Sequence, residues 1–97
     1  MKTLDINTLE WFDKVNGNTY FASKVTIDYT LPTENELILP FQYGYGNQSE
    51  YQAIKELQKQ NLLPVPLGGH LNSYCKDNNI ILHIKKRNGL KRELKDI

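Results

Sequence analysis

The fold of this 97-residue chain is decided at residues 40–52, which read PFQYGYGNQSEYQ. Before this stretch apolar and polar residues alternate, as is typical of strands, and after it the apolar spacing is that of a helix. Gly44 and Gly46 lie between aromatic residues and give the backbone access to positive φ angles. Ser49 and Gln52 fit a capping box, which predicts that a helix begins at Ser49. The stretch is therefore predicted to be a strand-to-helix turn.

Three antiparallel strands joined by short turns are predicted before this turn, at residues 9–15, 19–30 and 36–43. Asn16-Gly17 predicts a type I′ hairpin after the first strand, because this turn needs positive φ at both central residues. Residues 1–8 have little pattern and are predicted to form a loose N-terminal arm.

The third strand carries a proline in its interior. Pro40 has no amide hydrogen, so it places this strand at a sheet edge or marks a bulge. Strict alternation predicts that the residues on one face of this strand are Leu37, Leu39, Phe41 and Tyr43.

Two helices and further strands are predicted after the turn. The first helix buries Ala53, Ile54 and Leu57, and an apolar connector at residues 62–69 leads to a short helix at residues 70–77. Residues 80–84 form the most apolar run and predict a central strand. Asn88-Gly89 predicts a second hairpin, which returns through residues 90–94.

The predicted fold class is α+β, in one domain that covers residues 1–97. An antiparallel sheet of four or five strands carries one main helix and one short helix on one face, in the order β-β-β-α-α-β-β. The helix and the sheet are predicted to bury a common set of side chains, namely Val25, Ile27, Ile54, Leu57, Ile80 and Leu82.

Composition excludes several classes of protein. Hydrophobic residues make up 39% and charged residues 24%, which is the balance of a globular domain. No apolar run approaches the roughly 20 residues of a membrane span, and no signal peptide is expected at the N-terminus. The single cysteine, Cys75, is expected in the core, which favours a cytoplasmic protein.

Candidate ligand-binding residues fall in two groups, Tyr43, Gly44, Tyr45 and Gly46 in the turn and Lys85, Lys86 and Arg87 after the last apolar run. The tyrosines can stack on bases, and cations favour phosphate, so the two groups are chemically complementary. Simpler interpretations are a tight turn whose tyrosines pack, and lysines that guard an edge strand against aggregation. No catalytic residue, metal ligand or cofactor site is predicted, because no nucleophile, acid–base pair or ligand spacing stands out.

Several strings resemble a group of small uncharacterised bacteriophage proteins. The resemblance covers most of the chain in order, through WFDKVNGNTY at residues 11–20, PFQYGYG at residues 40–46, Tyr74-Cys75 before Asn79-Ile80, and Lys91-Arg92. It implies a phage accessory protein in the cytoplasm of a host, and it supplies no catalytic residues.

The function expected from this setting is non-enzymatic binding that inhibits a host component, including an immune one. The target is either a host protein, blocked by surface contact, or a small anionic nucleotide that the protein sequesters. Single-stranded nucleic-acid binding is the alternative, which would use exposed aromatic residues beside the basic strand. A membrane partner is not expected, and oligomerisation is left open.

Overall fold

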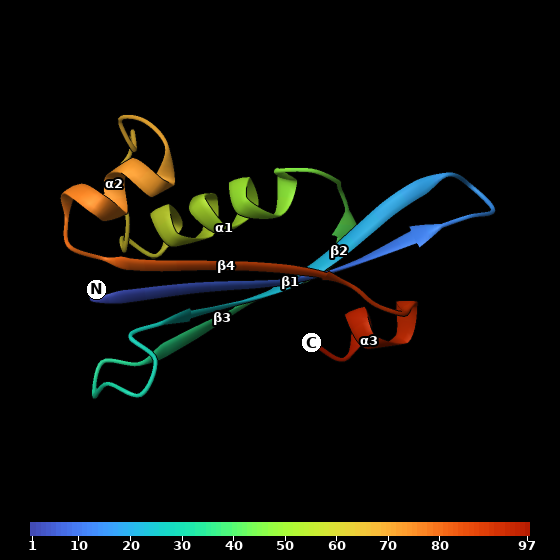
Figure 1. The fold of residues 1–97 in the computed structure, drawn as a ribbon, viewed down its shortest axis with the longest axis horizontal. Coiled ribbons are helices and arrows are strands. Elements are labelled where there is room, and N and C mark those ends of the chain that lie inside the picture. Colours follow the sequence, from blue (N-terminus) through green and yellow to red (C-terminus); the bar gives the residue numbers. More distant parts are fainter.

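A computed structural model describes residues 1–97 and confirms the α+β class. One mixed four-stranded sheet has two helices on one face and a third, short helix on the other (Figure 1). The elements in chain order are β1 (Thr3–Asp13), β2 (Asn18–Ile27), β3 (Asn35–Tyr43), α1 (Gln48–Lys59), α2 (Leu71–Asp77), β4 (Ile81–Asn88) and α3 (Lys91–Lys95).

The sheet has the strand order β3-β2-β1-β4, and β4 runs parallel to β1. The prediction of a wholly antiparallel sheet is therefore wrong for this strand. The helices α1 and α2 carry the chain across one face from β3, at one edge, to β4, at the other (Figure 1). Such a helical crossover allows the next strand to run parallel, which a short turn cannot do.

The N-terminal segment is a central strand, so the prediction of a loose arm over residues 1–8 is wrong. β1 begins at Thr3 and pairs with β2 on one side and β4 on the other. Leu4 and Ile6 are fully buried beneath the helices. β4, predicted to be central, lies instead at an edge, where Ile81 is 58% exposed.

The predicted second hairpin is also wrong, because the chain continues from β4 into α3. The Gly89 amide donates to the Glu10 carbonyl at 2.8 Å, which extends the pairing with β1 instead of starting a turn back. The Glu93 carboxylate then accepts a hydrogen bond from the Leu90 amide at 2.8 Å, which helps to cap the N-terminus of α3. Leu94 is buried on the sheet.

The first hairpin is confirmed, although its turn is wider than type I′. Gly17 has a φ of 71°, whereas Asn16 is not in the positive region. The Gly17 amide donates to the Asp13 carbonyl at 2.7 Å, and the Asp13 side chain accepts from the Val15 amide at 3.0 Å. The carboxylate therefore organises a four-residue loop that needs only one left-handed residue.

Pro40 marks a bulge on an edge strand, as its missing amide hydrogen predicted. The pairing of β3 with β2 shifts register opposite Phe21–Ser23, and strict alternation is lost there. Leu39 consequently packs beneath the helices, whereas Phe41 lies on the opposite face against Tyr20. The prediction that residues 37, 39, 41 and 43 share a face is wrong for this reason.

The core lies mainly between the sheet and helices α1 and α2. Of the six side chains predicted to share it, Val25, Ile27 and Leu57 are buried, and Ile54, Ile80 and Leu82 are half-buried and pack against them. The predicted capping box is absent. The helix begins at Gln48, and Ser49 is buried within its first turn.

Asp28 ties the start of β1 to the end of β2. Its carboxylate accepts hydrogen bonds from the Thr33 hydroxyl at 2.7 Å, from the Thr3 amide at 3.1 Å and from the Lys2 amide. These donors, led by Thr33, lower the pKa of Asp28 from 3.8 to about 2.

The stability that ionised Asp28 contributes should depend on pH. Because the folded pKa is the lower one, this contribution is complete above pH 3.8 and is lost as the pH falls toward about 2. We expect Asp28→Asn to melt below the parent at pH 6, and the gap to shrink as the pH approaches 2. Asn tolerates the φ of 53° at this position, so the substitution removes the charge and one acceptor oxygen without straining the backbone. A gap that stays constant between pH 5 and pH 2 would contradict this role.

Candidate anion-binding site

One face of the sheet is largely free of helices. Helices α1 and α2 cover the face that carries Leu4, Ile6 and Val25. On the opposite face only α3 packs, over Leu9 and Ala22, so the rest of this face is open. We call it the open face.

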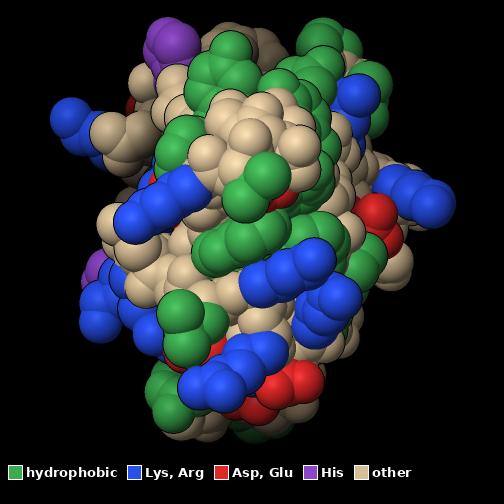
Figure 2. Space-filling view, turned by 90° about the vertical axis from the view of Figure 1, so that its right-hand side faces the viewer, with side chains coloured by type: hydrophobic (Ala, Val, Ile, Leu, Met, Phe, Trp, Pro, Cys, Tyr) green, Lys and Arg blue, Asp and Glu red, His purple; other side chains and the backbone are tan.

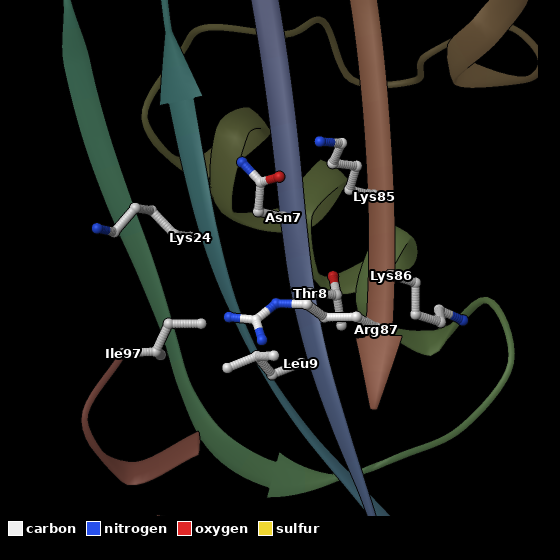
Figure 3. Close-up of a pocket in the computed structure, with 8 residues that line it drawn as sticks. All are labelled: Asn7, Thr8, Leu9, Lys24, Lys85, Lys86, Arg87 and Ile97. Atoms are coloured by element: carbon white, nitrogen blue, oxygen red, sulfur yellow. The ribbon is translucent and has the colours of Figure 1, made fainter. Parts of the chain in front are cut away.

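A basic depression lies on the open face beside α3. Its lining residues are Asn7, Thr8, Leu9, Lys24, Lys85, Lys86, Arg87 and Ile97 (Figure 3). The central strand β1 forms the floor, with Asn7 in register between Lys24 on β2 and Lys85 on β4. The Arg87 side chain reaches across β1 toward Leu9 and Ile97, which closes the end next to α3 (Figure 3).

Two cations of the depression lack a carboxylate partner. Lys85 and Arg87 form no salt bridge, and Lys24 approaches Glu36 only at 3.9 Å, with both side chains exposed to solvent. An exposed pair at this distance contributes little, so Lys24 remains free to reorient. The cations that extend over the open face therefore present two unpaired positive charges, on Lys85 and Arg87, and one loosely paired charge, on Lys24.

The depression offers groups that bind phosphate. A guanidinium donates two parallel hydrogen bonds to an oxyanion, and an ammonium adds a mobile point charge. The Asn7 amide supplies a further donor next to them. The Thr8 hydroxyl, by contrast, is bonded to the Ser23 hydroxyl at 2.7 Å and is buried. Arg87, Lys85 and Asn7 are thus the groups available to a ligand.

The predicted glycine-rich residues lie elsewhere. Tyr43, Gly44 and Tyr45 line a separate shallow depression with Asn47, Gln48 and Tyr51. Gly44 is buried, and a Cβ at this position would lie 2.7 Å from the Phe21 ring. Gly46 has a φ of 63°. Both glycines thus have structural reasons to be present, one for close packing and one for backbone conformation.

Lys86 joins the basic strand to this turn. Its ammonium donates a hydrogen bond to the Gly46 carbonyl and lies 3.9 Å from the Glu10 carboxylate. Neighbouring residues of a strand point to opposite faces, so Lys85 and Arg87 extend over the open face while Lys86 does not (Figure 3). The structure therefore brings one predicted cation to the turn, and separates the other two from the tyrosines.

The sequence prediction missed five of the lining residues, and among them are the two polar side chains that flank Lys85 on the open face, Asn7 and Lys24. The alternation Leu4-Asp5-Ile6-Asn7 was a signal for a strand with a polar face, which would have placed Asn7. Lys24 also stands on the polar side of an alternating strand. Their meeting with Lys85 depends on the parallel pairing of β4 with β1, and no local pattern indicates that pairing.

An aromatic row adjoins the depression under α3. Trp11, Tyr20 and Phe41 stand on three neighbouring strands, with ring centroids 5.7 Å and 5.0 Å apart in stacked geometry. The ammonium groups of Lys91 and Lys95 lie 5.4 Å and 5.9 Å from the centroids of Trp11 and Phe41. The ring faces are therefore largely occupied by each other and by α3.

Cys75 and the possible metal-binding side chains give little support for a reactive site elsewhere in the molecule. Cys75 is buried, and burial raises the pKa of its thiol. No three His, Cys, Asp or Glu side chains come together as they would around a metal ion. None of the helices has the length and apolar composition needed to cross a membrane.

The fold and this surface define the chain as a small α+β domain with a basic depression on an open sheet face. Comparisons with protein-family models, with curated proteins and with solved structures give no match to the chain.

Proposed function

We propose that this chain is a non-enzymatic binding protein that holds a small anionic nucleotide in the basic depression. The proposal rests on Lys85 and Arg87, two cations without a carboxylate partner. They lie beside Asn7 on the open face. A concave site lined by cations raises the local concentration of anions and favours their binding.

In the phage setting that the resemblance implies, such a protein acts in the host cytoplasm. By sequestering a nucleotide signal it would inhibit a host immune component without chemical conversion of the ligand. Arg87 and Lys85 would hold the phosphate, and the adjoining strands would hold the remainder of the molecule.

The test is nucleotide binding, measured by calorimetry with purified full-length protein and a panel of nucleotides. Reversing both charges, Lys85→Glu with Arg87→Glu, should weaken binding by about 100-fold or more, because two charge-assisted hydrogen bonds are lost. Lys76→Glu reverses an exposed charge on α2 and should bind like the parent. Equal binding by the double variant and the parent would overturn the proposal.

Lys86→Glu gives a second comparison within the same strand. Lys86 borders the depression, but its ammonium contacts the Gly46 carbonyl and Glu10 and does not extend over the open face with Lys85 and Arg87. We expect this variant to lose some thermal stability but to keep most of its nucleotide affinity. A melting curve for each variant separates loss of binding from loss of folding.

Direct contact with a host protein is a second candidate, favoured by a specific surface. Hydrophobic side chains flanked by lysine and arginine gather at the end of the molecule that carries the β1–β2 hairpin (Figure 2). The exposed residues there include Phe12, Val15, Tyr45 and Tyr51, and Val15 is 92% exposed. Exposed apolar patches of this kind often bind other proteins.

A pull-down from extract of infected cells discriminates between the two candidates. Identification of small molecules as well as proteins is required. Recovery of a host protein with the parent but not with Val15→Asp would favour contact through the hairpin end. Recovery of a nucleotide with the parent but not with the Lys85/Arg87 double variant would favour sequestration.

A further inference from the structure

A second depression continues from the basic one along the open face. Three residues, Asn7, Lys24 and Lys85, line both. Its other lining residues are Asp5, Thr26, Tyr29, Glu34, Glu36 and His83. The two depressions extend along β4 from Arg87 to His83, which are four residue steps or about 13 Å apart at the rise of a strand.

The two ends of this surface are opposite in charge. Arg87 and Lys85 stand at one end, and the carboxylates of Asp5, Glu34 and Glu36 stand at the other. Asp5 holds His83 across the strand pair, with Oδ1 and Nδ1 3.0 Å apart. A ligand with negative charge along its whole length would meet repulsion at the acidic end.

The acidic end contains an exposed aromatic ring on a segment of backbone that is held to the sheet. Tyr29 is 63% exposed, and its amide donates to the Thr3 hydroxyl at 3.1 Å. Asp28, which precedes it, is clamped to the start of β1 by its carboxylate. The backbone that carries the ring is thus held to the sheet, and the ring itself is exposed to solvent and accessible to a ligand.

We propose that the second depression is a nucleoside subsite, with the base stacked against Tyr29 and the phosphate between Lys85 and Arg87. Carboxylate oxygens of Asp5 and Glu36 would accept hydrogen bonds from ribose hydroxyls or from amino groups of the base. The subsite extends the proposed function, because it assigns a class and an orientation to the ligand of the basic depression.

The same geometry sets the size of the ligand. Arg87, Ile97 and α3 close one end, and the carboxylates of Glu34 and Glu36 discourage a further phosphate at the other. A mononucleotide fits this arrangement, because it has one phosphate for the basic end and an uncharged sugar and base for the acidic end. A nucleic-acid strand would carry its next phosphate either into α3 or into the acidic end.

Calorimetry with matched probes tests the subsite. The probes are the four ribonucleoside 5′-monophosphates, ribose 5-phosphate, and an oligonucleotide of about ten nucleotides. Since only the nucleotides carry a base that can stack on Tyr29, at least one monophosphate should bind about tenfold or more tightly than ribose 5-phosphate. The oligonucleotide should bind no more tightly than that monophosphate.

Variants of Tyr29 assign the effect to its ring. Tyr29→Leu should weaken binding of the monophosphate about tenfold and leave ribose 5-phosphate unchanged. Tyr29→Phe keeps the ring and should retain the parental affinity. Tyr45→Leu, at another exposed tyrosine outside both depressions, should behave like the parent.

The outcomes separate this inference from the proposed function. If no phosphorylated probe binds, both are overturned. If ribose 5-phosphate binds as tightly as every monophosphate, or if Tyr29→Leu affects both kinds of probe equally, the nucleoside subsite is overturned and the basic depression stands. Tighter binding of the oligonucleotide would overturn the limit on ligand size.

Discussion

Replacing Leu57 with alanine should lower the free energy of unfolding by about 2–5 kcal/mol. Leu57 is fully buried where α1 meets the sheet, among the largest cluster of buried apolar side chains. Truncation removes apolar area from the core and leaves a cavity that close-packed neighbours cannot fill. A change of this size is a large fraction of the stability of a domain of this length.

Leu90→Ala is the matched control, because it is the same substitution at a side chain that is 53% exposed. We expect its effect to stay within about 0.5 kcal/mol. Chemical denaturation of both variants measures the difference. Similar midpoints and slopes for Leu57→Ala and the parent would show that α1 does not pack as the structure has it.

Leu4→Ala should destabilise the domain by a similar amount, about 2–5 kcal/mol. Leu4 is fully buried on the central strand, opposite Ile27 of β2 and Leu82 of β4. Truncating Leu4 removes contacts that join β1 to its neighbouring strands and to the helices that cover them.

The effect of Leu4→Ala tests the position of the N-terminal segment directly. Asn7→Ala, in the same strand but exposed on the open face, should change stability by no more than about 0.5 kcal/mol. Equilibrium unfolding of the two variants gives the comparison. Equal small effects would mean that residues 1–8 form an arm and not the central strand.

The local elements of this fold could be predicted because their signals are local. The Asn16-Gly17 hairpin, the edge position of Pro40 and the two helices follow from turn chemistry, a missing amide and apolar spacing. The predicted capping box is absent because the helix begins at Gln48, so Ser49 is already the second helical residue and cannot serve as the N-cap.

The errors came from pairings between distant segments. The apolar run at residues 80–84 predicts a central strand, whereas in the structure Ile80 and Leu82 pack on one face only and Ile81 is exposed. Leu4 and Ile6 gave too short a pattern to show a central strand by themselves. A strand is central or peripheral according to its neighbours, and the neighbours of β1 come from both ends of the chain.

The candidate site shows the same division. Alternation along β4 is enough to place Lys85 and Arg87 on one face and Lys86 on the other. The residues beside these cations could not be inferred in the same way, because Asn7 and Lys24 reach them only when the long crossover lays β4 parallel to β1. The physical reason is that side-chain periodicity is a property of each strand, whereas register and direction depend on burial shared among segments far apart in the chain.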